Sequence, residues 1–404
     1  MKSWTIMIFM AGDNDLEGAA HADLIEMTRA GKSDQVNVVA EFDSRRDGTR
    51  RYEAHNGWLQ MAGKPLEETN TGDPAVLTRF IRWARIHYPA EKEMLVIWNH
   101  GTGWEDIPSD FKWSKIRDAT GRQLLRRALF TSTIETVQQA TIGERAIAAD
   151  ASSRDFLDNR ELQKALVDAL DGHPLDVLGM DACLMACVEV AYQIRDQARY
   201  LVASQELEPK IGWPYDLILG ALYARPVMSA RELSGLIVEA YGERGKEARA
   251  RTKYTQSALD LGQAEDTKMM VQALSESLSA YPECNLLLRR AINEVSQPER
   301  GAKRYYDRNL VDFYDWLWQL QRRYRGDDQA LDEAVGNILD RLKASNRDSF
   351  LVANSAVDGR DTERVHGVSI YLPQYRQYNA LYEDLDFASS GWPRFARAVS
   401  ERVR

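Results

Sequence analysis

Residues 175–186 read LDVLGMDACLMA, an apolar run that stops at Asp181 and is followed by Cys183. Two other segments share this arrangement of an apolar run ending at polar residues: TIMIFMAGDND at residues 5–15 and MLVIWNHGTGW at residues 94–104. Short apolar runs bounded by turn residues are typical of buried strands. In an open α/β sheet, ligands bind beyond the carboxyl ends of the strands. The three segments therefore predict strands whose ends present polar side chains at the rim of one sheet.

Helical patterns alternate with strand patterns through the first half of the chain. Asp73 followed by Pro74 is a typical helix start, and Asn56-Gly57 is a typical hairpin turn. The alternation predicts an α/β fold with a mostly parallel central sheet covered by helices on both faces. Further strands are predicted at residues 36–42, 147–149 and 200–204 and a polar ribbon at 52–61, with helices at 16–27, 73–87, 153–170 and 183–196.

The second half of the chain has a different character. Residues 229–345 are helix-rich and charged, and a late strand at about residues 365–372 is expected to return to the sheet. We therefore predict a catalytic domain over residues 1–228 and a helix-rich C-terminal region over residues 229–404. Within the first part, residues 105–145 are rich in Lys and Arg and lack a clear strand, which is typical of a long surface excursion.

The bulk composition excludes several classes of function. The formal net charge of -9 disfavours nucleic acid as a partner. No apolar stretch approaches the roughly 18 residues of a membrane span, so no membrane association is expected. Three cysteines (Cys183, Cys187 and Cys284) do not form a disulfide framework.

The apolar run at residues 6–10 is short and ends in an acidic turn, which predicts a strand rather than a signal peptide and favours a cytoplasmic location, with export left open. The oligomeric state is not indicated.

Cys183 and His100 are the residues with the chemistry of a thiol hydrolase. Cys183 is predicted to begin a helix, where the dipole and free amides stabilise a thiolate. His100 follows the strand at residues 94–98, and imidazole is the usual base for a thiol. The amides of Gly101 and Cys183 are candidates for an oxyanion hole. The alternative for each is a structural side chain, and Cys187, one helical turn later, is interpreted as core packing.

Four blocks together resemble the clostripain family of cysteine peptidases: MAGDNDLE at residues 10–17, VIWNHGTGW at 96–104, GMDACLMACVEVA at 179–191 and SQELEPKIGWPYD at 204–216. A fainter likeness returns at GVSIYLP, residues 367–373. The resemblance implies a caspase-like sandwich fold and a His100–Cys183 catalytic dyad. It also implies an endopeptidase whose polypeptide substrate has Arg or Lys before the cut bond.

The same resemblance implies where that basic side chain binds and how the enzyme is activated. Asp181 becomes the acidic floor of the pocket for the Arg or Lys, and Glu206 and Glu208 are secondary acidic candidates. Family members are often cut between the histidine and cysteine blocks, so self-cleavage is expected in the excursion at residues 105–145. The candidate positions for that cleavage are Lys112, Lys115 and Arg117. The alternative is an uncleaved surface loop.

Two rival functions follow from other features. A strand ending in Asp13 and Asp15 is how some metal-dependent phosphatases present a phosphoryl-transfer aspartate, although Glu17 stands where a hydroxyl residue is usual. A non-catalytic scaffold with the peptidase fold is the second rival.

No cofactor is required by the sequence. Calcium is an expectation from the resemblance only, and Asp150, Asp155 and Asp158 offer oxygen ligands without the spacing of a calcium loop.

Overall fold

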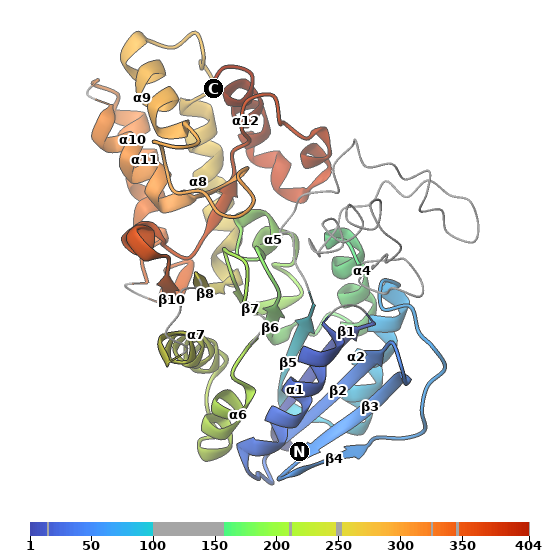
Figure 1. The fold of residues 1–404 in the computed structure, drawn as a ribbon. Helices are drawn as coiled ribbons and strands as arrows, with labels where there is room; N and C mark the ends of the chain where they lie inside the picture. The colour runs from blue at the N-terminus through green and yellow to red at the C-terminus, as the bar shows by residue number, and fades with distance from the viewer. Residues whose placement is uncertain are drawn as a thin grey trace, which may run out of the picture.

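The computed structural model describes residues 1–13, 16–99, 157–209, 212–247, 253–324, 326–344 and 347–403. Within these ranges the strands form a nine-stranded sheet in the order β10-β8-β7-β6-β5-β1-β2-β3-β4 (Figure 1). A separate two-stranded sheet consists of β11 and β9. The strands are β1 Lys2–Gly12, β2 Val36–Ser44, β3 Gly48–His55, β4 Trp58–Met61, β5 Ala90–Trp98, β6 Leu175–Asp181, β7 Ala198–Ala203, β8 Tyr254–Asp260, β9 Leu310–Asp312, β10 Leu351–Val357 and β11 Ser369–Tyr371.

Helices of the described residues cover both faces of the large sheet. Their bounds are α1 Glu17–Met27, α2 Pro74–His87, α4 Asn159–Leu170, α5 Val188–Gln193, α6 Tyr215–Ala224, α7 Ala230–Glu247, α8 Ala264–Ser277, α9 Leu286–Ser296, α10 Phe313–Arg323, α11 Gln329–Arg341 and α12 Trp392–Ser400. In the described part of the chain, no helix is both long enough and apolar enough to cross a membrane.

The centre of the sheet is parallel, as the sequence predicts. The five strands β7-β6-β5-β1-β2 run in one direction. Antiparallel pairs extend the sheet on both sides, with β3 and β4 beside β2 and with β8 and β10 beside β7. Because parallel strands end at the same rim, the segments that follow β1, β2, β5 and β6 leave the sheet close to one another.

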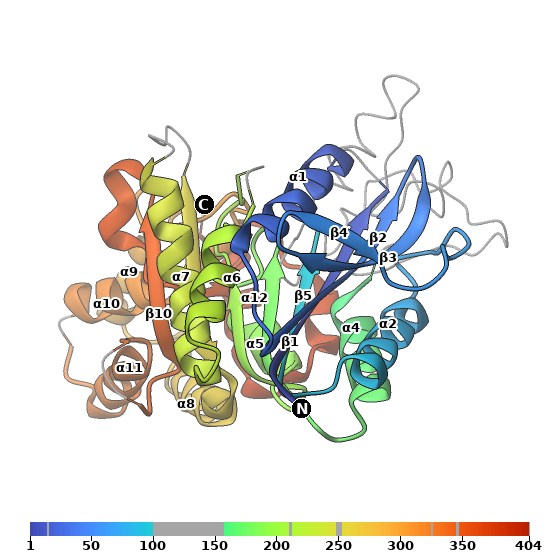
Figure 2. The same cartoon turned by 90° about the horizontal axis from the view of Figure 1, so that it is seen from below.

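The core explains why the apolar runs of the strands are continuous. Along β1, Ile6, Ile8 and Met10 pack on one face of the sheet, with α1, α6 and α7, while Met7 and Phe9 pack on the other. That second face is covered by α2, α4, α5 and the helices α8 to α12 of the C-terminal region (Figure 2). A strand buried on both faces needs apolar residues at every position, which removes the alternation seen in half-exposed strands.

Local signals fix the helices that cover the sheet. The side chain of Asp73 accepts a hydrogen bond from the amide of Ala75 at 2.8 Å, which confirms the predicted start of α2. Asp158 caps α4 through the amides of Arg160 and Glu161, and the Glu161 side chain accepts in return from the Asp158 amide. The predicted polar ribbon is confirmed as β3 and β4, joined at Asn56-Gly57.

The structure corrects two predictions for the second half. The late strand is β11, but it pairs with β9 in the small sheet instead of returning to the large one. The strands that do join the large sheet are β8 and β10, which the sequence pattern did not reveal among the surrounding helices. The predicted strand at residues 147–149 and the excursion at residues 105–145 lie outside the described residues.

Candidate active site

The neighbouring parallel strands β5 and β6 bring the two chemical blocks of the sequence to one rim of the sheet. Trp98 and Asp181 are register partners, and each is the last residue of its strand. The amide of Asn99 then donates a hydrogen bond to the carbonyl oxygen of Asp181 at 3.3 Å. His100 and Gly101 come directly after Asn99 but lie outside the described residues. The predicted contact of His100 with Cys183 and the predicted oxyanion hole therefore stay predictions.

Cys183 lies in a tight turn and not at the start of a helix, so that prediction is wrong. Helix α5 begins only at Val188, with Cys187 at its N-cap position. Leu184 adopts a left-handed backbone with φ of 63°, which costs a residue with a side chain roughly 1–2 kcal/mol. The half-buried Cys183 sulfur instead accepts a hydrogen bond from the amide of Glu208 at 3.2 Å. A backbone donor takes the place of the helix dipole as support for a thiolate.

Three carboxyl groups gather beside this turn, and we call Asp23, Asp181 and Glu208 the acidic cluster. Asp181 is 5% exposed, and its Oδ2 accepts hydrogen bonds from the Tyr215 hydroxyl at 2.9 Å and from the Trp213 amide at 3.3 Å. Glu208 and Asp181 are hydrogen-bonded through their side chains. Asp23, on α1, accepts a hydrogen bond from Trp98 Nε1 at 2.8 Å. The cluster thus joins α1, the ends of β5 and β6, and the segment after β7.

Ionisation of the acidic cluster has a high electrostatic cost. Burial, and then the charge of Asp181, raise the pKa of Asp23 to about 8. Burial likewise raises the pKa of Asp181, and burial followed by the nearby Asp181 raises that of Glu208 well above its ordinary value. Among the described residues, none of the three forms an ion pair. Arg244, whose charge acts on Asp23, forms ion pairs with Glu26 at 3.0 Å and Asp216 at 2.7 Å instead. Such a group of carboxyls is chemically suited to receive a cation.

Two glycines allow the acidic cluster to be packed so tightly. A Cβ atom on Gly212 would lie 3.1 Å from Asp23 Oδ2 and 3.4 Å from Asp181 Oδ2, and its φ of 60° also favours glycine. A Cβ atom on Gly179 of β6 would lie 2.8 Å from the Trp213 indole. That indole donates to Gln256, whose amide in turn donates to Glu208 Oε1, each at 3.0 Å when the Gln256 amide is oriented to satisfy both neighbours.

Sequence reasoning missed Asp23 as a member of this cluster. Asp23 lies on the buried side of α1, beside Ala20 and Leu24, and only the tertiary contact with Trp98 shows that its carboxyl group belongs to the cluster. The sequence prediction named Glu206 and Glu208 together, but their side chains separate. Glu206 Oε1 accepts hydrogen bonds from the amides of Leu207 and Tyr306, at 3.1 and 3.0 Å. Glu206 thus faces the C-terminal region, and its contacts favour a structural role.

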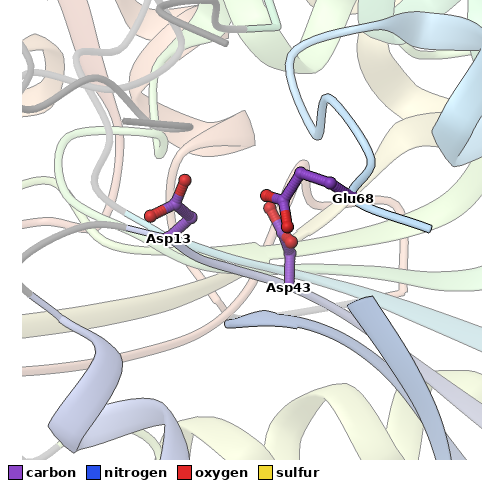
Figure 3. Close-up of side chains that lie close together, drawn as sticks. All are labelled: Asp13, Asp43 and Glu68. Carbon is purple, nitrogen blue, oxygen red and sulfur yellow. The ribbon is translucent and has the colours of Figure 1, made fainter. Parts of the chain in front are cut away.

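A second group of carboxyls lies at the ends of β1 and β2 and could hold a divalent cation. One oxygen from each of Asp13, Asp43 and Glu68 lies within 4.8 Å of the others (Figure 3). Gly12 permits this approach, because a Cβ atom there would lie 2.4 Å from the Phe42 ring and 2.9 Å from the Asp43 carbonyl oxygen. An all-oxygen, carboxylate-rich set fits calcium or magnesium.

The other residues considered as metal ligands are placed differently. Glu17 accepts hydrogen bonds from Ser44 Oγ and from the amide of Arg46, at 2.8 and 3.2 Å, and takes no part in the group of Asp13. Asp158 serves as the cap of α4. Asp15, Asp150 and Asp155 lie outside the described residues. Because Asp15 is among them, the structure does not test the Asp13–Asp15 pair on which the phosphatase alternative depends.

Comparison with known proteins agrees with this architecture. The Clostripain family profile matches residues 8–117 and 135–401. Clostripain from Hathewaya histolytica is 28% identical over 447 residues, which cover 94% of this chain and 76% of that protein. An inactive zymogen C11 protease from Parabacteroides distasonis superposes with a TM-score of 0.64 at 19% identity, over 96% of this chain and 98% of that one. A secreted C11 cysteine protease from Bacteroides thetaiotaomicron, in complex with an irreversible peptide inhibitor, gives 0.65 at 19% identity, over 97% and 99%. The predicted caspase-like α/β fold is confirmed.

Proposed function

Because the chain belongs to the clostripain family of cysteine peptidases, we propose that it is an endopeptidase that cuts polypeptides after Arg or Lys through Cys183 and His100. The observation that carries the proposal is the acidic cluster, three carboxyl groups packed against the turn that bears the Cys183 sulfur. A peptidase for neutral side chains has no need of three buried carboxyl groups, whose ionisation is costly without a cation.

In the proposed reaction, the reacting groups come from the segments that follow β5 and β6. The Cys183 thiolate attacks the carbonyl carbon of the substrate, and His100 delivers the proton to the leaving amine. Backbone amides, with Gly101 and Cys183 as the candidates, hold the oxyanion, and water then hydrolyses the acyl-enzyme. The bond from the Glu208 amide to Cys183 Sγ supports the thiolate form, since an N–H donor stabilises a charged acceptor more than a neutral one.

The substrate side chain before the cut bond is proposed to bind at the acidic cluster. Arg fits the cluster better than Lys, because a planar guanidinium can donate to two carboxylates at once. Asp181 is the central member, since it contacts Glu208 directly and lies two residues before Cys183. Glu208 adds a second carboxylate, and its own amide donates to the Cys183 sulfur.

Activation by self-cleavage is also a proposal. Its candidate positions Lys112, Lys115 and Arg117 lie outside the described residues. The family profile skips residues 118–134, inside the same charged excursion. One relative of this fold is described as an inactive zymogen, which makes activation by cleavage a property to test here. Denaturing gels of the wild type and Cys183→Ala provide that test, and two fragments from both proteins would refute cleavage in cis.

Calcium is proposed as a structural ion and not as a participant in the reaction. Asp13, Asp43 and Glu68 are the residues that would hold it. When bound, the ion would relieve the repulsion between their carboxylates and tie β1, β2 and the segment after β4 together. No step of the peptidase reaction requires it.

The decisive experiment is labelling with an arginyl chloromethyl ketone, followed by mass spectrometry. A single adduct on Cys183, together with hydrolysis of fluorogenic Arg peptides that Cys183→Ala abolishes, is the expected result. No adduct on a folded protein would favour the scaffold. Phosphatase activity that survives Cys183→Ala but not a chelator or Asp13→Asn would favour the metal-dependent rival, which family membership already disfavours.

A further inference from the structure

The segment 204–208, which follows β7, is hydrogen-bonded to the turn that carries Cys183. Three hydrogen bonds join the two: the Glu208 amide donates to Cys183 Sγ at 3.2 Å, the Leu184 amide to the Glu206 carbonyl at 3.3 Å, and the Ala186 amide to the Ser204 carbonyl at 2.8 Å. The position of the sulfur relative to its amide donor therefore depends on where this segment is held.

Gln205 anchors the segment to the C-terminal region. Its side chain is fully buried, donates to Asp312 Oδ2 at 3.3 Å and accepts from the Gly367 amide at 2.8 Å. These partners lie 107 and 162 positions away in the sequence. A buried amide loses its hydration, and an aliphatic side chain would fill the same space at lower cost. What the Gln205 amide adds is a pair of hydrogen bonds that fixes the segment 204–208 relative to Asp312 and Gly367.

Asp312 is held firmly enough to serve as that reference point. It is fully buried at the end of β9 and caps α10 through the Asp315 amide at 2.8 Å. The Tyr305 hydroxyl donates to it at 2.8 Å, the His366 amide at 2.7 Å, and His366 Nδ1 lies 3.1 Å from it. A carboxylate with donors from so many elements cannot shift without breaking several bonds together.

We propose that Gln205 is a positioning residue for the nucleophile. By binding Asp312 and Gly367, Gln205 holds the segment 204–208 in place and so keeps the Glu208 amide within hydrogen-bond distance of the Cys183 sulfur. The inference rests on the proposed function, because it takes Cys183 as the reacting thiol. It assigns the C-terminal region a part in thiol reactivity, although no residue of that region is proposed to contact the substrate.

The test compares Gln205→Met with Gln193→Met. Methionine matches glutamine in size but makes neither bond. Gln193 is a matched control, because it is 2% exposed, donates to Gln163 Oε1 at 2.7 Å and accepts from the Asp386 amide at 3.2 Å, at the far end of α5. The readout is the rate at which iodoacetamide alkylates Cys183, followed by mass spectrometry from pH 5 to pH 10. This rate does not depend on peptidase activity.

We expect the midpoint of the alkylation profile of Gln205→Met to move up by about one pH unit, which is a tenfold loss of thiolate below the midpoint. Gln193→Met should keep the wild-type profile despite a similar loss of thermal stability. Should Gln205→Met fail to fold, Gln205→Asn serves instead, because its amide is one methylene too short to span Asp312 and Gly367 and should shift the profile in the same direction.

A wild-type profile in a folded Gln205 variant overturns the inference, and so does an equal shift in Gln193→Met. Failure of the proposed function looks different. In that case the wild type does not hydrolyse Arg peptides, or Cys183→Ala hydrolyses them as fast as the wild type does, whatever the alkylation profiles show.

Discussion

Asp181→Asn should remove the preference for arginine while leaving the shape of the acidic cluster intact. Asparagine has the size of aspartate and keeps an oxygen that can accept from the Tyr215 hydroxyl, 2.9 Å away in the wild type. What it loses is the negative charge beside Cys183. The change therefore separates an electrostatic role of Asp181 from a structural one.

The size of the effect follows from the type of bond that is lost. A hydrogen bond between a guanidinium and a carboxylate contributes about 1.5–3 kcal/mol more than no bond at all. Since each 1.36 kcal/mol is tenfold in rate, kcat/KM for an Arg peptide should fall by about 10- to 150-fold. The lower part of this range is expected, because Glu208 and Asp23 remain to share the cation.

The assay uses two fluorogenic peptides that differ only in Arg or citrulline before the cut bond. Citrulline is a neutral analogue of arginine with nearly the same shape. The wild type should prefer Arg strongly, and Asp181→Asn should lose most of that preference with little change toward citrulline. If kcat/KM falls equally for both peptides, Asp181 supports the fold of the site and the electrostatic reasoning is refuted.

The same ratio should depend on pH. Burial raises the pKa of Asp181, and burial together with the charge of Asp181 raises the pKa of Asp23 to about 8. A guanidinium binds the ionised form, so substrate binding has to displace protons that the free enzyme holds. The preference for Arg over citrulline should thus increase as the pH rises from 6 toward 8, because fewer protons remain to be displaced. Ionisation of the Cys183 thiol affects both peptides equally and so does not change the ratio of their kcat/KM values. A ratio that stays constant over this pH range would contradict the proposed origin of specificity.

Three further predictions concern the residues around the site. The melting temperature of Asp23→Asn should exceed that of the wild type by about 2 °C or more at pH 8.5 but by less at pH 5.5. The reason is that a folded-state pKa of about 8 for Asp23 makes the wild type lose stability as the pH rises between about 4 and 8. An equal difference in melting temperature at both pH values would contradict this. Gly179→Ala should lower kcat/KM for Arg peptides about tenfold, because its Cβ displaces the Trp213 indole 2.8 Å away, and wild-type kinetics would show that the indole yields without cost. Millimolar calcium should raise the melting temperature of the wild type by about 2 °C or more and that of Asp43→Asn by less. An equal rise in both would exclude the group of Asp13, Asp43 and Glu68 as the calcium site.

The sequence predicts the sheet well because its signal is local. Apolar runs that stop at Asp13, at Asn99 and at Asp181 mark strand ends, and parallel pairing then brings those ends to one rim. The turn at Cys183 could not be predicted in the same way. Residues 183–196 have a helical pattern, but hydrogen bonds to the distant segment 204–208 hold Leu184 in a left-handed conformation and delay the helix to Val188.

The acidic cluster was predictable only in part. Asp181 and Glu208 lie in blocks that resemble a known family, whereas Asp23 belongs to no such block and reaches the cluster through α1. Likewise, Glu206 and Glu208 are equivalent in the sequence, two acidic residues separated by one position. In the structure the Glu206 side chain accepts from the Tyr306 amide, whereas the Glu208 side chain is hydrogen-bonded to Asp181, and their spacing in the sequence does not predict this difference.

The antiparallel attachment of β8 to β7 has a consequence for any attempt to shorten this protein. A fragment that stops at residue 228 would leave the backbone groups of β7 without the partners at residues 257–260 that now satisfy them. A bare, apolar strand edge of this kind recruits strands from other chains and leads to aggregation. The second half of the chain therefore protects the solubility of the first, and the smallest unit that can be purified in folded form should extend past β10.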